Sequence, residues 1–156
     1  MIILGIDPGT TRIGYGAIKL EKGVLTHVSS GILPISKQHT HPLSVIHKEL
    51  LRIISEVKPD RVGVEKLFFA KNKKTALAVA EARGVIIHTI ASENIPIYEC
   101  TPNEVKVAVT GNGTANKQAV AKMVSSILRT PLTHLVDDAT DALAIAITCI
   151  NTRIEG

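Results

Sequence analysis

The sequence predicts an α/β fold in which a mixed five-stranded sheet is flanked by helices. Three observations lead to this prediction: apolar strand-like runs open the chain, helical and strand-like segments alternate in its middle, and helical segments fill its last third. The first three strands are expected to be antiparallel and the later ones parallel. The chain of 156 residues contains neither a repeat nor a linker, which predicts one domain, residues 1–156.

Short apolar runs bounded by turn residues mark the first three strands. The run from Ile2 to Ile6 is typical of a buried central strand and stops at Asp7-Pro8-Gly9. A second strand is expected from Arg12 to Leu20, and Lys22-Gly23 forms the turn into a third from Val24 to Leu33. These boundaries predict an antiparallel meander before the first helix.

In the middle of the chain the pattern alternates between helix and strand. Apolar residues repeat at helical spacing from Pro42 to Val57, and Lys58-Pro59 ends that helix. A short strand from Arg61 to Glu65 leads through a basic loop to a long helix that starts at about Thr75. Gly84 is expected to interrupt this helix, at a point where another backbone approaches closely.

The remainder of the chain combines one strand with three helices. The strand is expected from Ile95 to Glu99. Thr101-Pro102-Asn103-Glu104 is a capping sequence that predicts a short helix ending at Gly111. Further helices are expected from Asn116 to Leu128 and from Asp138 to about Thr152, the last of them across the sheet.

Composition limits the classes of function. Lys and Arg number 18 against 14 Asp and Glu, and the net charge of +4 favours a polyanionic partner such as nucleic acid. The two cysteines lack zinc spacing and are expected to be buried in a reducing cytosol. The chain start does not resemble a signal peptide and no apolar stretch is long enough for a membrane span, which predicts a cytoplasmic location and no membrane partner.

Four acidic residues occupy positions that this fold could bring together. Asp7 and Glu65 each end a predicted strand, whereas Asp138 and Asp141 are three apart at the start of the last helix and project from one face. Two carboxylates about 4 Å apart repel by roughly 4 kcal/mol at an effective dielectric constant near 20. Converging acids would therefore require cations, and oxygen ligands select Mg²⁺ or Mn²⁺. Two such ions could activate water and stabilise the leaving oxygen of a phosphodiester.

Each acid also has a structural interpretation. Asp7 precedes Pro8-Gly9 and could be a turn residue, Asp138 could cap the last helix, and Asp141 could interact with the helix dipole. Glu65 is harder to explain, because it follows the apolar run Val62-Gly63-Val64. The combination of all four acids, two at strand ends and two on one helix face, favours a metal site.

Several motifs occur in a characteristic order along the chain. They are Ile6-Asp7-Pro8-Gly9, Gly14-Tyr15-Gly16, the segment from Glu65 to Asn72, Ala82-Arg83-Gly84 and the segment from Asp138 to Ala146. Together they resemble the RuvC family of crossover junction endodeoxyribonucleases over essentially the whole chain. The resemblance implies a ribonuclease H-like fold and a homodimer that resolves Holliday junctions, by symmetric nicking of opposed strands at a four-way DNA junction in recombination and repair.

The resemblance also implies roles for individual residues. The family's catalytic acids fall on Asp7, Glu65, Asp138 and Asp141, which would hold Mg²⁺, two ions for each site, with Mn²⁺ as a substitute. A branch-migration motor complex is implied as a further partner. Lys106 and Lys117 match basic positions beside the scissile phosphate, where positive charge would stabilise phosphoryl transfer.

The basic loop after Glu65 is expected to contact DNA. Phe68 matches the family's stacking aromatic and could stack on an unpaired base, although it could also lie on the surface while Phe69 packs inward. The lysines of this loop that could bind phosphates are Lys71, Lys73 and Lys74. The alternative for any of these lysines is a solvated side chain without a DNA contact.

Several alternatives remain open at this point. The small residues between Thr75 and Ala91 could pack against a twin helix in a dimer or against the chain's own sheet. Asp7 to Thr11 also resembles a phosphate loop of sugar kinases and actin-like ATPases, but such folds are over twice as long. The other candidates are a ribonuclease H-like nuclease acting on another nucleic acid and a junction-binding module without activity, although the intact acids argue against the latter.

Overall fold

The computed structural model describes residues 1–9, 12–35, 41–66, 73–132 and 137–150. Its strands are β1 (Ile2–Asp7), β2 (Gly14–Glu21), β3 (Val24–Ile32), β4 (Arg61–Glu65) and β5 (Ile97–Cys100). Its helices are α1 (Pro42–Val57), α2 (Lys73–Ser92), α3 (Pro102–Thr110), α4 (Lys117–Leu128) and α5 (Asp137–Thr148). Within these ranges, no helix combines the length and apolar character needed to cross a membrane.

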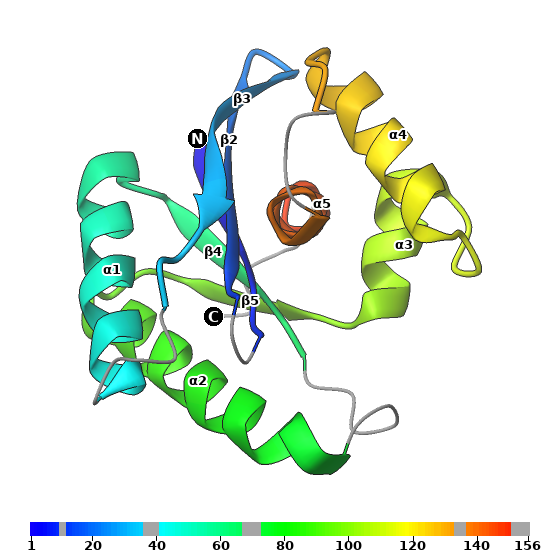
Figure 1. Ribbon diagram of the computed structural model, residues 1–156. Helices are drawn as coiled ribbons and strands as arrows, with labels where there is room; N and C mark the ends of the chain where they lie inside the picture. The colour runs from blue at the N-terminus through cyan, green and yellow to red at the C-terminus, as the bar shows by residue number, and fades with distance from the viewer. Residues whose placement is uncertain (10–11, 36–40, 67–72, 133–136, 151–156) are drawn as a thin grey trace.

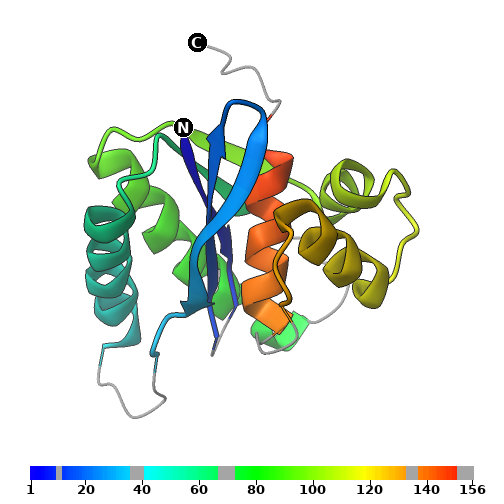
Figure 2. The same cartoon turned by 90° about the horizontal axis from the view of Figure 1, so that it is seen from above.

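These elements form three layers (Figures 1 and 2). The sheet is the middle layer, α1 and α2 cover one face, and α5 lies on the other face with α3 and α4 outside it. The strand order is β3-β2-β1-β4-β5. β1, β2 and β3 form an antiparallel meander, whereas β1, β4 and β5 run parallel. The predicted mixed five-stranded sheet is confirmed.

Most predicted boundaries agree with the structure to within two residues. The sequence expectation for α1 is met at both ends, and the capping box at Thr101 and Glu104 is present at the start of α3. The last helix ends at Thr148, before the predicted end at Thr152. The predicted interruption at Gly84 is wrong, because α2 is continuous. Gly84 lies on the exposed side of the helix, and a Cβ atom there would meet no other described segment of this chain within 4 Å.

Alternation along the strands divides the core into two clusters. Successive strand residues point to opposite faces of the sheet. Leu4 and Ile6 of β1 therefore pack with α1 and α2, in a cluster that also contains Val62 and Val64. Ile3 points the other way, into the cluster formed around α5. Asp7 follows Ile3 by four residues, an even spacing, and therefore belongs to the α5 face as well.

Glycines on the α5 face let this helix lie directly against the sheet. A Cβ atom at Gly5 would overlap the backbone of Ala142, and one at Gly14 would overlap the backbone of Asp138. Gly16 and Gly63 likewise leave no room for a side chain beneath α5. Figure 1 shows α5 end-on, enclosed between the sheet on one side and α3 and α4 on the other. Its position fixes the helix start relative to the ends of β1 and β4.

Candidate active site

One cleft collects all four of the predicted acids. Its volume is about 410 Å³, and it lies where the ends of β1 and β4 meet α3, α4 and α5. The charged residues that line it are Asp7, Glu65, Lys106, Lys117, Asp138 and Asp141. The catalytic residues proposed from the sequence are thus brought together from five separate elements.

The two strand acids are aimed by the same local pattern. Asp7 follows Gly5 by two residues and Glu65 follows Gly63 by two, so each acid shares its glycine's face of the sheet. Ile6 lies beside Val64 in the parallel pair, and the residues that follow them are therefore level with each other. In each strand the missing side chain of the glycine lets α5 pack against the sheet. The acid two residues later lies next to the start of α5.

The two helix acids come from the first turns of α5. Asp138 lies in the first turn, and Asp141 follows one turn later on the side that faces the cleft. Carboxylates are stabilised near a helix N-terminus by the partial positive charge there. Asp137 also lies in the first turn, but it is exposed and is not part of the cleft lining.

The acids perturb one another's ionisation. The pKa of Asp7 rises from 3.8 to about 8, first because of burial and then because of the negative charges of Glu65, Asp141 and Asp138. The pKa of Glu65 rises from 4.5 to about 6, through burial and the charge of Asp141. Buried carboxylates that repel one another at neutral pH would be relieved by a divalent cation, and their oxygens suit a hard ion. The acids at this cleft therefore fit a Mg²⁺ or Mn²⁺ site chemically.

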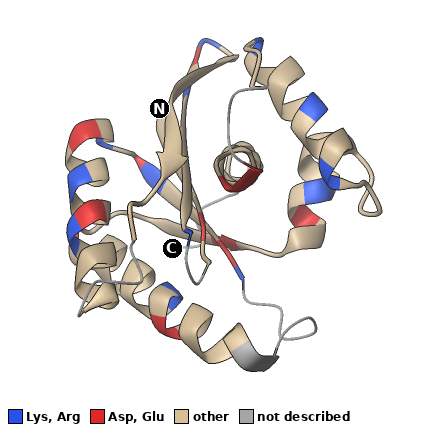
Figure 3. Ribbon diagram, in the orientation of Figure 1, with Lys and Arg blue, Asp and Glu red and all other residues tan. Residues whose placement is uncertain are grey.

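Two lysines face these acids across the cleft. Lys117 Nζ donates to Asp141 Oδ2 at 2.8 Å, and this hydrogen bond raises the pKa of Lys117. Lys117 is the first residue of α4, where the helix dipole disfavours a cation. Lys106 comes from α3 and is partly buried. Figure 3 shows acidic ribbon on α5 and on the strands beside it, and basic ribbon on α3 and α4 opposite, where α3 also carries an acidic segment at its start.

The acids surround the cleft without forming a finished metal cage. Among the described residues, no group of three or more acid, histidine or cysteine side chains is spaced to hold an ion. The Lys117 ammonium neutralises part of the negative charge through Asp141. Binding of an ion would therefore require the carboxylates to turn towards one another, and the ion would compete with Lys117 for Asp141.

The structure describes only part of the proposed DNA-binding loop. Phe68 and Lys71 lie outside the described residues. Lys73 and Lys74 begin α2, but their side chains also fall outside the description. Their roles stay predictions.

Sequence reasoning missed how the strand acids are supported. Gly5 and Gly63 were not identified from the sequence as the positions against which α5 packs, although glycine inside a strand is a signal of close backbone approach. Arg83 had been noted only as part of a motif, yet its Nε donates to the backbone carbonyl of Glu65 at 3.0 Å. That contact joins residues 18 positions apart and has no sequence signal.

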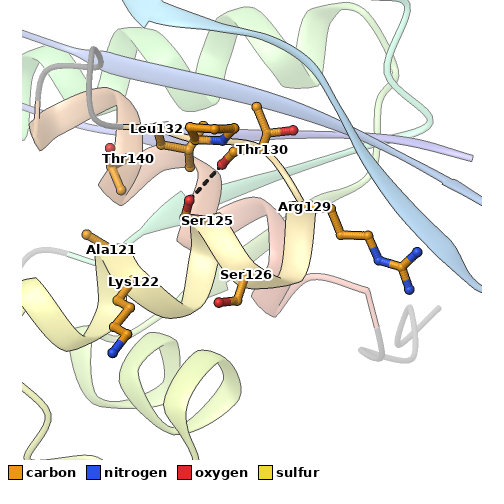
Figure 4. A pocket seen from close by; sticks show the side chains of 9 residues that line it. Ala121, Lys122, Ser125, Ser126, Arg129, Thr130, Leu132 and Thr140 are labelled. Atoms are coloured by element: carbon orange, nitrogen blue, oxygen red, sulfur yellow. Dashed lines mark hydrogen bonds between the residues drawn. The ribbon is translucent and has the colours of Figure 1, made fainter.

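A larger cavity of about 600 Å³ lies beside α4 and the start of α5 (Figure 4). Its described lining contains no carboxylate. Ser125 Oγ donates to the Thr130 carbonyl at 2.7 Å, and Thr130 Oγ1 donates to the Leu128 carbonyl at 3.0 Å. Its cations, Lys122 and Arg129, extend away from this bond in different directions. The cavity therefore lacks convergent polar groups, and the acidic cleft is the candidate active site.

Comparison with known sequences gives one consistent family. The family model of crossover junction endodeoxyribonuclease RuvC matches residues 3–149. The crossover junction endodeoxyribonuclease RuvC of Pseudothermotoga lettingae is 43% identical over 148 residues, which cover 94% of this chain and 91% of the relative. The corresponding protein of Petrotoga mobilis is 45% identical with the same coverage.

Solved structures agree with the sequence comparison. Thermus thermophilus RuvC superposes with a TM-score of 0.85 at 33% identity, covering 95% of this chain and 92% of that one. The same protein in complex with a Holliday junction substrate gives a TM-score of 0.87 at 31% identity, with the same coverage. The yeast mitochondrial Holliday junction resolvase, at 14% identity and a TM-score of 0.66, shares the fold. The predicted ribonuclease H-like fold is confirmed.

Proposed function

The chain belongs to the RuvC family of crossover junction endodeoxyribonucleases, and from this premise we propose that it resolves four-way DNA junctions by metal-dependent hydrolysis in the acidic cleft. The observation that carries the proposal is the convergence of four acids and two lysines on one cleft. A polyanionic substrate also suits the net charge of +4. We propose residues 1–156 as a single nuclease domain.

The chemistry of the cleft assigns a role to each group. Asp7, Glu65, Asp138 and Asp141 would hold two Mg²⁺ ions, with Mn²⁺ as a substitute. Such ions, when bound, supply an activated water and stabilise the leaving oxygen. Lys106 and Lys117 would place positive charge beside the phosphate, whose charge grows during phosphoryl transfer. Phe68 and the lysines at positions 71, 73 and 74 are proposed to contact the DNA of the junction.

A nicking assay tests the proposal. The protein is incubated with a synthetic four-way junction, a linear duplex of the same sequence or an RNA–DNA hybrid, in Mg²⁺, Mn²⁺, Ca²⁺ or chelator. We expect paired symmetric nicks in the junction with Mg²⁺ or Mn²⁺ and none in chelator. Preferred cleavage of the hybrid would favour the alternative nuclease, and junction binding without cleavage in any metal would favour a non-catalytic module.

Replacing Lys117 with methionine should slow nicking without weakening metal binding. Loss of one charge-stabilising donor typically reduces the rate by about 10²- to 10³-fold. Asp141 would lose its ammonium partner at 2.8 Å, so we expect Mn²⁺ affinity to be unchanged or higher. Single-turnover nicking and calorimetric Mn²⁺ titration measure the two effects. Lys122→Met, on the same helix but outside the cleft, is the control; equal slowing in both variants would contradict the role of Lys117.

We extend the proposal to a homodimer formed through α2. Leu77, Gly84 and Ala91 are spaced by seven residues on one side of α2, and all three are exposed. Leu77 is 72% exposed, which is unusual for a large apolar side chain, and Gly84 is open to close approach. A two-fold dimer would present two clefts to a junction of matching symmetry. A cytoplasmic location and a branch-migration motor as partner are proposed from the family resemblance alone.

Leu77→Glu should therefore convert the dimer into monomers. A charge in the middle of an apolar contact would be desolvated without a partner, which disfavours association. Sedimentation velocity measures the oligomeric state, and a junction on a small circle separates paired from single nicks. Met123→Glu, an equally drastic change of an exposed apolar residue on α4, should leave the dimer intact. A Leu77→Glu protein that stays dimeric would place the interface elsewhere.

A further inference from the structure

Arg83 of α2 reaches the end of β4 and contacts Glu65 through its backbone. Its Nε donates to the Glu65 carbonyl oxygen at 3.0 Å, and its Nη2 forms an ion pair with Glu99 of β5. Only 19% of the Arg83 side chain is exposed, so its bond to the Glu65 carbonyl is partly sheltered from water, whereas the Glu99 carboxylate is 44% exposed. A planar guanidinium that is engaged at two of its nitrogens is held in one orientation.

The peptide group that follows Glu65 is held at both of its polar ends. Arg83 binds its carbonyl oxygen, and its amide, which belongs to Lys66, donates to the Cys100 carbonyl at 2.8 Å. This peptide group fixes the backbone torsion on the C-terminal side of Glu65, at the last residue of β4. The direction of the Glu65 side chain depends on that torsion.

We propose that Arg83 is a positioning residue that aims the Glu65 carboxylate into the acidic cleft. It does so by locking the Glu65–Lys66 peptide plane, while Glu99 holds the neighbouring Nη2 of the guanidinium in place. The inference rests on the proposed function, because it needs Glu65 to bind the metal. It adds a support that comes from α2, the helix proposed to form the dimer, so a shift of α2 would be transmitted to Glu65.

The test uses Arg83→Lys in the full-length protein. Lysine keeps the charge, but its single ammonium lacks the planar fork and cannot hold both partners in the same geometry. Partners that orient a metal ligand typically contribute about 10- to 100-fold in metal affinity or activity. We expect the Mn²⁺ affinity of the DNA-free protein, measured by calorimetry, to fall within that range. We also expect kcat on the junction to fall while KM is unchanged.

Arg52→Lys is the matched control, because Arg52 is an exposed arginine whose ion pairs among the described residues are with Glu49 and Glu56 of the same helix, α1. Both its Mn²⁺ affinity and its kcat should equal those of the wild type. A folded Arg83→Lys protein with wild-type Mn²⁺ affinity and kcat would overturn the inference. A wild-type protein that neither binds Mn²⁺ nor cuts junctions would overturn the proposed function, and this inference with it.

A Glu65→Gln background separates positioning from general stabilisation. If Arg83 acts through the Glu65 carboxylate, Arg83→Lys should weaken Mn²⁺ binding no further in that background, and an equal loss in both backgrounds would overturn the inference. The wild type provides a measurement that does not depend on folding of any variant. The Arg83 Nε–H signal in the NMR spectrum should shift on titration with Mg²⁺, and an unmoved signal would count against the proposal.

Discussion

Replacing Asp7 with asparagine should abolish junction cleavage and, at the same time, stabilise the metal-free protein at neutral pH. Asparagine keeps the size of the side chain but removes the charge that repels Glu65, Asp138 and Asp141. Loss of a residue that merely orients a metal ligand typically reduces activity by about 10- to 100-fold. Loss of the ligand itself should reduce cleavage by more than this. An opposite effect on activity and stability is the signature of a site whose acids are gathered for a cation.

The pH dependence of stability gives the sign of this effect. The pKa of Asp7 is about 8 in the folded protein, against an ordinary value of 3.8, so between these values the folded state binds the extra proton. The free energy of unfolding of the metal-free protein should therefore fall as pH rises from 3.8 towards 8. Each unit of pKa difference corresponds to about 1.4 kcal/mol. The stabilisation of Asp7→Asn should be absent at low pH and on the order of a few kcal/mol at the upper end of the window.

Thermal unfolding at several pH values, with and without Mg²⁺, measures this prediction. Mg²⁺ should raise the melting temperature of the wild type above neutral pH and have less effect on Asp7→Asn. Asp137→Asn removes an exposed charge from the same region of α5 and should keep its cleavage activity. If Asp7→Asn cleaves the junction at the wild-type rate, Asp7 is not a catalytic ligand and its high pKa has another origin.

The elements and the acids could be predicted from the sequence because their signals are local. Apolar periodicity located the strands and helices, and a carboxylate at the end of a buried strand is conspicuous in the case of Glu65. The face on which each acid lies also follows from local alternation, once β1 and β4 are known to be parallel neighbours. The pairing of β1 with β4 cannot be predicted without the complete topology of the sheet.

Other features depend on contacts between distant segments. The helix pattern could not show that Gly84 lies on an exposed face of α2, whereas the close approaches within the chain are at Gly5, Gly14 and Gly63. The bond from Arg83 to the Glu65 carbonyl likewise depends on the packing of α2 against the end of the sheet. Glycine is the common sequence signal of close approach, but only the fold identifies which glycines are used.

Gly5→Ala should strongly destabilise the protein, because it adds a methyl group where the sheet touches the backbone of α5. The new Cβ atom would overlap the carbonyl group of Ala142 and the amide of Ala146, both of which are backbone groups of α5. Side chains can rotate away from a clash, but a helix backbone has to move as a unit. Adding volume to a close-packed core typically costs about 1–3 kcal/mol, and backbone opposition places this case at the upper end or beyond.

The same displacement should impair the active site before the protein unfolds. Asp138 and Asp141 lie on α5, whereas Asp7 and Glu65 lie on the sheet, so movement of the helix away from β1 widens the cleft between the two pairs. A misplacement of about 1 Å in a catalytic arrangement can reduce the rate by about 10²-fold. We therefore expect the folded fraction of Gly5→Ala to bind Mn²⁺ more weakly and to nick junctions more slowly.

Ser126→Thr is the matched control for this substitution, because it adds one methyl group at an exposed position of α4, away from the sheet and from α2. Exposed substitutions of this kind usually change stability by less than about 0.5 kcal/mol, so this variant should be as stable as the wild type. Denaturant unfolding gives the free energies of unfolding of both variants, and Mn²⁺ calorimetry reports the state of the cleft. A loss of stability and weaker Mn²⁺ binding are expected only in Gly5→Ala, because α5 rests directly on Gly5. If Gly5→Ala is as stable as the wild type and binds Mn²⁺ equally well, the position of α5 does not depend on the glycines of the sheet beneath it.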